Sequence, residues 1–496
     1  MPVGGKITWK MIFLGMVYLI FSSAIFLFAF LPCVFILYRI LPGLKSRNLL
    51  LALASLVFYA FGQLEYVPLF LLSVLINYFS GLILSSVKSH RKLIVAVSVI
   101  LNIGILCVFK YTDFLIENLN SAFSLHIAGT GIILPIGISF FTFQGLSYTI
   151  DVYRDPNSGS RNFLKLLLYI SFFPQLIAGP IVKYHDISLQ IDSRVCTAEE
   201  TAAGIRRFIV GLSKKILISN AVGYIADAVF NGYLHGLTGS ADWRLMWLGG
   251  ICYTLQIYYD FSGYSDMAIG MGHMFGFTIL ENFRHPYAAV SIRDFWRRWH
   301  ISLSSWFREY LYIPLGGNRK GRFRTVLNRM LVFLCTGIWH GANWTFVVWG
   351  LCHGLLSSLE GVGVIPVEKL NHSRAGRLIS RVYTLLAVML LFVVFRADSL
   401  RDAGVFISSM FTGTVSAEGS FLLRSLLSPA AVTVIVVAVL AAGGINAKVF
   451  AAGERLEKRF PSLFLSVKNL LCLVLLILSV LSLSRGGFNP FIYFQF

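Results

Sequence analysis

Charged residues are scarce in this sequence, and their scarcity excludes an ordinary soluble protein. Only 13% of the 496 residues are Asp, Glu, Lys or Arg, whereas 56% are hydrophobic. Soluble domains carry about 25% charged residues, and a soluble chain of this length could not bury so much apolar surface. The composition therefore predicts an integral membrane protein.

Acidic residues are the scarcer of the two charge types. The chain has 23 Asp and Glu against 42 Lys and Arg, which leaves a net charge of +19. In a soluble protein this excess would suggest a nucleic-acid partner, but we find no nucleic-acid motif. In a membrane protein, Lys and Arg gather in cytoplasmic loops. We therefore expect membrane lipids and no nucleic acid around this chain.

Cysteine pairs and the short motifs of several enzyme classes are also lacking. The seven cysteines form no CxxC pair, so they predict small buried side chains and no disulfide framework. His300, His340, His353 and Asp260 are conceivable metal ligands, but no HxH, HExxH or Cys–His spacing supports them, and we expect no metal. The lack of a GxSxG elbow and of a P-loop argues against a serine hydrolase and an ATP-driven transporter.

Long apolar runs with short polar breaks fill most of the chain. About 20 apolar residues cross a bilayer as a helix, so the runs predict an all-α polytopic protein with roughly ten to thirteen membrane segments, some of them re-entrant. No repeat or low-complexity linker divides them, which predicts one membrane domain over residues 1–496. The first run, 11–40, is too long for a signal peptide and is expected to be retained. The start residue is Met1 or Met16.

One segment between the apolar runs is rich in charge. Residues 284–329 hold ten basic side chains and two acidic ones. Such a segment is expected on the cytoplasmic side or at the membrane interface. It is also the best place in the chain to attract a polyanion.

Within this segment, the run from Asp294 to Arg308 permits two interpretations. At helical spacing Trp296 and Trp299 begin one broad apolar stripe, which predicts an amphipathic helix at the interface with Arg297 and Arg298 outward. On this pattern alone the interfacial helix is favoured. The alternative is that His300, at the edge of the stripe, faces a polar cavity among the tryptophans.

A second histidine lies inside an apolar stretch, Gly337–Trp344. Ionisable residues in membrane segments are rare and usually face a cavity, so for His340 we favour a functional role over a neutral ring bonded to a carbonyl. Trp339, Asn343 and Trp344 would shape its surroundings. His353 follows 13 residues later and is expected to pack behind the site.

Two carboxylates, Asp260 and Asp266, lie at membrane depth or its edge. They would either orient a histidine or pair with arginine, and the pairing is favoured.

A histidine in a membrane cavity suits general-base chemistry. Its unperturbed pKa of about 6.5 allows proton transfer at neutral pH, which contributes roughly a hundred- to ten-thousand-fold in rate. Arginine is suited to phosphate recognition, so the basic segment 284–329 could hold the phosphates of a donor. The combination is consistent with acyl transfer from coenzyme A to an attacking alcohol or thiol.

These motifs resemble the membrane-bound O-acyltransferase family, most closely its bacterial alginate O-acetyltransferase branch. The resemblance extends from about Met16 to the C-terminus, where Asn489–Phe496 is also similar, and it is weaker over 401–470. About fifteen extra N-terminal residues depart from the pattern. The runs that carry the resemblance are Leu134–Gln144, Tyr259–Ala268, Arg293–His300, Tyr312–Gly317 and Trp339–Trp344.

The resemblance implies a ring of tilted helices around a funnel, with His340 as the catalytic residue and His300 as a second, near-essential one. It implies that acetyl groups pass from acetyl-CoA across a Gram-negative inner membrane to a periplasmic acetyltransferase or esterase-like partner, or directly to an exported polysaccharide such as alginate. No bound cofactor is expected. The expected donor tunnel is lined by Trp339, Asn343, Trp344, Trp296, Trp299, Arg297 and Arg298.

Two other functions remain open from the sequence. An exporter of polysaccharide or lipid-linked sugar without acyl chemistry would suit the many spans and the basic face. Such an exporter should show internal pseudo-symmetry, which the sequence lacks, and it would not need His340. An acyltransferase acting on a cell-wall polymer shares the reaction class and differs only in its acceptor.

Overall fold

The structure is a computed structural model, and every regular element in the part of the chain that it describes is a helix. This confirms the predicted all-α class. The choice between Met1 and Met16 as start residue lies outside the described residues. Those residues are 19–234, 242–443, 453, 455–484 and 491–492.

The chain forms two compact units, and the first comprises Met1–Leu106, Ile133–Ile177 and Tyr184–Val195. Buried amides hold its helices together: the Asn77 amide donates to Asn102 at 3.0 Å, and Thr149 donates to Asn77 at 2.9 Å. Such hydrogen bonds join helices inside a membrane protein. The helices of this unit are η1 (Phe26–Phe30), α2 (Leu31–Ile40), α3 (Gly43–Gln63), η2 (Leu64–Tyr66), α4 (Val67–Ser86), the first half of α5 (Arg91–Phe123), α6 (Ile138–Arg154), η3 (Pro156–Ser158), α7 (Phe163–Ser171), α8 (Phe173–Leu176) and α9 (Tyr184–Asp192).

The second unit comprises Cys107–Ile132, Ala178–Lys183 and Cys196–Phe496. The division into units does not test the single-domain prediction, which stays a prediction. Besides the second half of α5, its helices are α10 (Ala198–Ser213), η4 (Lys214–Ser219), α11 (Asn220–Leu234), α12 (Trp243–Met274), η5 (Pro286–Ala288), α13 (Ile292–Arg298), α14 (Ile301–Phe307), η6 (Arg308–Tyr312), α15 (Gly321–His340), α16 (Trp344–Val362), α17 (Val367–Leu370), α18 (Arg374–Arg396), α19 (Leu400–Thr412), α20 (Ala417–Leu426), α21 (Pro429–Ala442) and α23 (Pro461–Ser484).

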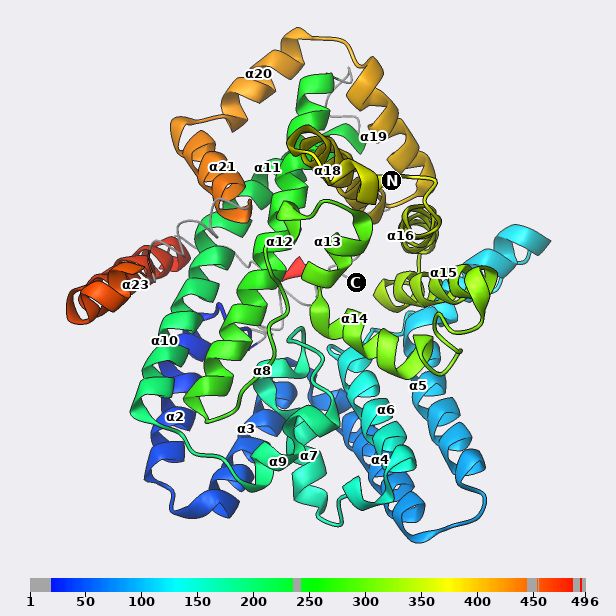
Figure 1. Ribbon diagram of the computed structural model, residues 1–496, viewed down its shortest axis with the longest axis vertical. Helices are drawn as coiled ribbons and strands as arrows, with labels where there is room; N and C mark the ends of the chain where they lie inside the picture. Colours follow the sequence, from blue (N-terminus) through cyan, green and yellow to red (C-terminus); the bar gives the residue numbers. More distant parts are fainter. Residues whose placement is uncertain (1–18, 235–241, 444–452, 454, 485–490, 493–496) are drawn as a thin grey trace. The chain divides into compact units, whose positions relative to one another are not determined.

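Helix α12 is the long element on which much of the second unit packs (Figure 1). Its N-terminus is capped by the Asp242 carboxylate, which accepts from the Arg244 N–H at 3.0 Å. Glycines let α12 approach α10 closely, because a Cβ added at Gly211 would lie 2.5 Å from the Gly263 carbonyl oxygen. This close packing fixes the face of α12 that carries Asp260 and Phe261.

Among the residues that the structure describes, six helical stretches are long and apolar enough to cross a membrane, and counting the bent pair α20–α21 as one span makes seven. The sequence predicted roughly ten to thirteen segments. The predicted number is larger because it included apolar runs that form short helices, such as α7, or that carry several charges, such as α15. The six stretches are Gly43–Ser86, Arg91–Phe123, Ala198–Gly232, Trp344–Val362, Arg374–Arg396 and Pro461–Ser484.

Candidate active site

His340 is the last residue of α15, and the chain turns there into α16. Gly341 is extended, and the Asn343 side chain caps α16 by accepting from the Thr345 N–H at 3.0 Å. The two helices approach closely at glycine, since a Cβ on Gly350 would lie 2.4 Å from a backbone oxygen of α15. The helix end and the close packing together fix the backbone of His340.

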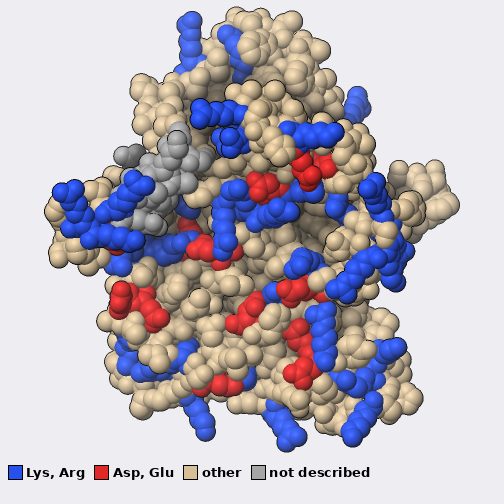
Figure 2. All heavy atoms as spheres, in the orientation of Figure 1, with Lys and Arg blue, Asp and Glu red and all other residues tan. Residues whose placement is uncertain are grey.

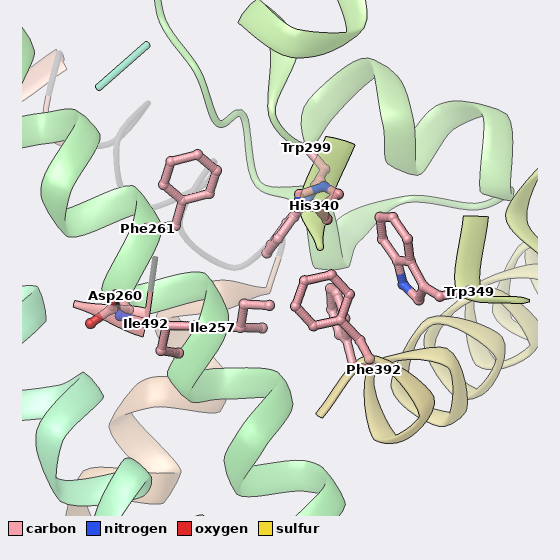
Figure 3. A pocket seen from close by; sticks show the side chains of 9 residues that line it. Ile257, Asp260, Phe261, Trp299, His340, Trp349, Phe392 and Ile492 are labelled. Atoms are coloured by element: carbon pink, nitrogen blue, oxygen red, sulfur yellow. Dashed lines mark hydrogen bonds between the residues drawn. The ribbon is translucent and has the colours of Figure 1, made fainter. Parts of the chain in front are cut away.

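A small cavity lies beside His340 within the second unit (Figure 3). Figure 3 shows Trp349 and Phe392 near the imidazole, with Ile257 and Phe261 reaching toward the cavity from α12. The cavity leaves only about 10 Å³ for the centres of water molecules, which is about what one ordered water needs. An acyl group can enter only when lining side chains move. The lining residues are Ile257, Asp260, Phe261, Trp299, His340, Trp349, Phe392, Phe395 and Ile492.

Aromatic rings surround the buried imidazole of His340. The ring centroids of Trp339 and Trp349 each lie 5.0 Å from it, and that of Phe395 lies 5.3 Å away. All three contacts are edge-to-face, the geometry that aromatic pairs prefer. Apolar rings therefore enclose the imidazole on these sides and keep water away from it.

The second histidine, His300, lies at a break between α13 and α14. The predicted continuous helix from Asp294 to Arg308 is wrong. His300 adopts left-handed backbone angles (φ 45°, ψ 52°), and the Ile301 N–H donates to the Asn282 carbonyl at 3.0 Å instead of continuing the helix. A non-glycine residue at positive φ is uncommon and often marks a constrained site.

The break buries the His300 ring instead of leaving it at an interface. Its ring packs edge-on against Phe261 at 4.5 Å and lies 6.1 Å from Trp339. The Ser302 hydroxyl donates to Asn282 at 2.9 Å, so in its 3.5 Å contact with His300 the imidazole Nδ1 acts as the donor. Burial lowers the pKa of His300 to about 3, so the ring is neutral at neutral pH.

His353 lies behind the cavity, on α16. The Trp296 indole N–H donates to His353 Nδ1 at 3.3 Å, so the proton of this imidazole sits on Nε2. Its ring lies 5.0 Å from Trp349, which in turn contacts His340. The structure thus links the three histidines through tryptophan rings, and His353 itself does not line the cavity.

The two carboxylates take cationic partners and do not contact a histidine. Asp260 pairs with Lys215 and also accepts from the Ile492 N–H at 2.9 Å. Asp266 pairs with Arg207 and Lys214, each at 2.6 Å. Asp260 nevertheless lines the cavity, at the wall formed by α12 (Figure 3).

Four of the residues predicted to form the donor tunnel lie away from the cavity. Trp344 is 52% exposed, and its indole donates to Asn118 on α5 at 2.9 Å. Asn343 caps α16 and donates to the Asp398 carbonyl. Arg297 is exposed, and Arg298 pairs with the carboxylate four residues before it. Of the predicted tunnel residues, only Trp299 lines the cavity.

Several cavity residues were not found from the sequence. Phe392 and Phe395 belong to α18, and Ile492 belongs to the C-terminal segment. These two segments are far in sequence from the histidine motifs. Apolar residues of this kind give no chemical signal in a membrane protein. In the part of the chain that the structure describes, no group of three His, Cys, Asp or Glu side chains is placed to hold a metal ion.

Comparison with known proteins assigns this arrangement to a class. Residues 138–397, which include all three histidines and both carboxylates, match the model of the membrane-bound O-acyltransferase family. The chain belongs to this family. Acyl transfer is thus its activity, and an exporter without acyl chemistry is not supported.

The names of individual relatives indicate which acyl group is transferred. The chain is 38% identical to a probable alginate O-acetylase, AlgI, of Pseudomonas putida, over 96% of this chain and all of that protein. It is 42% identical to the corresponding Pseudomonas aeruginosa protein over 79% of this chain and 75% of that protein. It is 38% identical to a peptidoglycan O-acetyltransferase of Helicobacter pylori over 78% of each chain. The chain is accordingly an O-acetyltransferase.

Proposed function

We propose that this chain takes acetyl groups from cytoplasmic acetyl-CoA and passes them across the inner membrane for O-acetylation of an exported polysaccharide such as alginate. The observation that carries the proposal is the buried His340 at a dry, aromatic-lined cavity. The similarity to proteins named for alginate O-acetylation, over nearly the whole chain, supports the polymer acceptor.

His340 acts as the general base in this proposal. Its neutral imidazole takes the proton of an acceptor hydroxyl while the hydroxyl oxygen attacks the thioester carbonyl. The carbon–sulfur bond of the donor then breaks, an ester forms, and the proton passes to the departing thiolate. Trp339, Trp349 and Phe395 hold the ring in place and keep water away from the thioester.

His300 supports this site without carrying charge. Its low pKa keeps it neutral at neutral pH, and its ring touches Phe261 of the cavity wall and Trp339 next to the general base. It therefore orients the aromatic wall against which the donor's acyl group lies.

The phosphates of acetyl-CoA bind at the basic start of α15. A second cavity there offers about 300 Å³ to the centres of water molecules and is lined by Arg322, Thr325 and Arg329. Figure 2 shows Lys and Arg side chains gathered at the right of the view, beside the position of α15 in Figure 1. From Arg329 to His340 the helix rises about 16 Å at 1.5 Å per residue. An extended pantetheine arm suits a phosphate site and a thioester site that are separated in this way.

A periplasmic acetyltransferase or esterase-like protein receives the acetyl group, or the polymer receives it directly. The second candidate acceptor is a cell-wall polymer, because the chain is also 38% identical to the peptidoglycan O-acetyltransferase of Helicobacter pylori, over 78% of this chain. A teichoic acid D-alanyltransferase of Bacillus subtilis is less similar, at 29% identity over 52% of this chain.

The test compares the acetyl content of the exported polysaccharide in cells that carry the wild-type chain, His340→Ala or the control His372→Ala at equal amounts in the membrane. His372 is exposed and lies outside the site. Loss of acetylation at unchanged polymer yield in His340→Ala alone would support the proposal. Normal acetylation in His340→Ala would refute the role of His340. Acetyl lost from peptidoglycan instead would assign the cell-wall acceptor.

A further inference from the structure

Lys110 reaches the end of the helix that carries His340. It lies in the second half of α5, which belongs to the same unit as α15. Its ammonium donates to the Trp339 carbonyl at 2.6 Å and to the His340 carbonyl at 3.0 Å. The next residue on α5, Tyr111, donates its hydroxyl to the Ile338 carbonyl. Three successive carbonyls at the end of α15 thus accept hydrogen bonds from α5.

These bonds meet a need that α15 cannot meet itself. The last four carbonyls of a helix have no donor within the helix, and they carry the negative end of the helix dipole. Gly341 is extended and adds no backbone cap to this end of α15. A lysine offers three donors and a positive charge, so Lys110 satisfies two carbonyls and opposes the dipole at the same time.

The charge of Lys110 has no carboxylate partner in the described part of the chain, where its hydrogen bonds go to carbonyls alone. An ionisable residue in a membrane helix is costly and is usually retained for function. Many helix C-termini are capped by backbone N–H groups that follow a Gly or Asn in the left-handed conformation, so capping alone does not require a lysine. The position of this lysine, directly on the backbone of the general base, is the distinguishing feature.

We propose that Lys110 is a positioning residue: its ammonium holds the last turn of α15 so that the His340 imidazole stays packed against Trp349 and Phe395. The inference rests on the proposed role of His340 and extends it to a residue 230 positions away in the chain. Because one of the two acceptors is the carbonyl of His340 itself, any movement of this turn moves the catalytic ring.

The adjoining contact on α5 supports the same arrangement. The Asn118 side chain accepts from the Trp344 indole at 2.9 Å, and Phe114 packs against that ring with centroids 5.9 Å apart. Helix α5 therefore contacts both sides of the turn between α15 and α16. Lys110 acts at the end of α15, and Asn118 acts at the start of α16.

The experiment measures acetyl transfer by membranes from a strain that makes the acetylated polymer and lacks its own copy of this chain. The variants are Lys110→Met, Lys110→Arg and, as a control on the same helix, Lys92→Met, where the side chain is exposed. The rate is divided by the amount of chain in the membrane, and acetyl-CoA is varied to separate kcat from KM.

For Lys110→Met we expect kcat to fall by roughly ten- to a hundredfold, because a displacement of about 1 Å can reduce a rate a hundredfold. The KM for acetyl-CoA should stay unchanged, because Lys110 is not part of the phosphate site. Lys110→Arg keeps a charge and several donors, so it should recover a large part of kcat. Lys92→Met should match the wild type. Lys110→Gln, which keeps a donor without the charge, replaces the methionine variant if that protein does not accumulate.

A wild-type kcat in Lys110→Met, or a Lys110→Arg variant no better than Lys110→Met, would overturn the inference. An increase in KM with unchanged kcat would also overturn it, because it would place Lys110 in donor binding. His340→Ala in the same membranes separates the two proposals. If His340→Ala is inactive and Lys110→Met has full kcat, only the inference about Lys110 fails; if His340→Ala remains active, the proposed function of His340 fails.

Discussion

Replacing Asp260 by leucine should destabilise the protein strongly, and a second replacement should reverse much of the loss. Asp260 and Lys215 form an ion pair in which the side chains are only 2% and 3% exposed. The leucine would leave the buried Lys215 ammonium without the Asp260 carboxylate. Breaking a buried ion pair in this way costs about 3–5 kcal/mol.

The double variant Asp260→Leu with Lys215→Met removes both charges. Replacing a whole buried pair by apolar side chains is often neutral or stabilising. One loss remains, because the carboxylate also accepts from the Ile492 N–H at 2.9 Å, and a buried donor left unpaired costs about 1–3 kcal/mol. Asp260→Leu leaves the same N–H unpaired, so this loss cancels between the two variants. The double variant should therefore be more stable than Asp260→Leu by about 3–5 kcal/mol, the cost of the unpaired lysine.

Thermal unfolding of the purified chains in detergent measures these differences. The control is Glu457→Gln, which removes one partner of an ion pair that is 42% and 45% exposed; such surface pairs contribute about 0–1 kcal/mol. If the double variant is no more stable than Asp260→Leu, the reasoning about the pair is wrong. Acetyl transfer by the double variant then decides the role of Asp260: retained activity makes the carboxylate structural, and a stable but inactive protein makes it part of the reaction at His340.

Three further predictions concern the backbone and the charges. Both His300→Asn and His300→Val remove the imidazole, but valine should lower the stability by about 1–2 kcal/mol more than asparagine, because of the two only Asn tolerates the left-handed backbone. Equal thermal unfolding midpoints for the two variants would contradict this. Hydrogen bonds to Asp151 and to a second carboxylate raise the pKa of His185 to about 10. The stability that this histidine adds to the fold is therefore complete below about pH 6.5 and is lost as the pH rises towards 10. Unfolding midpoints measured across this range should depend less on pH in His185→Gln than in the wild type. Gly350→Ala should lower stability by about 1–3 kcal/mol through steric overlap with α15, whereas Gly404→Ala on a helix with open space should raise it slightly.

The ionisable groups of the site stand out in the sequence, because charge and polarity are conspicuous in a chain with so few charged residues. His340 stands out as an ionisable group in an apolar run, and the structure places it at a cavity. The prediction that Asp260 and Asp266 each pair with a cationic side chain is also confirmed. The partner of Asp260 is a lysine and not the expected arginine, since only the packing of α12 against η4 determines which cation is near.

The geometry around the site was not predictable from local pattern. Trp296 and Trp299 have the spacing of a helical stripe, but the helix is broken after them. The Arg284 N–H donates to the Arg298 carbonyl and the Ile301 N–H donates to the Asn282 carbonyl. Hydrophobic periodicity cannot predict such bonds between distant segments. Lys110 stands where the apolar run ends in the sequence, although the helix continues to Phe123. Its importance depends on carbonyls about 230 residues away.

The size of the cavity at His340 leads to a prediction about the acyl group itself. The cavity has room for about one water centre, so even an acetyl group enters only when lining side chains move, and a longer group requires a larger movement. One extra methylene in a tight apolar pocket is worth about 1–3 kcal/mol, or roughly ten- to two-hundredfold in kcat/KM, and the site should therefore prefer acetyl to longer groups. Ile257 lines the cavity from α12, and Ile257→Val removes one methylene at a stability cost of about 0.5–1.5 kcal/mol.

The space gained in Ile257→Val matches the methylene by which propionyl exceeds acetyl. Use of propionyl-CoA relative to acetyl-CoA should therefore rise in Ile257→Val and rise further in Ile257→Ala. Ile251→Val makes the same chemical change on the same helix, at a side chain that is 38% exposed, and should leave the preference unchanged. If Ile257→Val reaches the membrane in normal amounts and discriminates as the wild type does, the acyl group is not held in this cavity and the transfer must take place elsewhere along the chain.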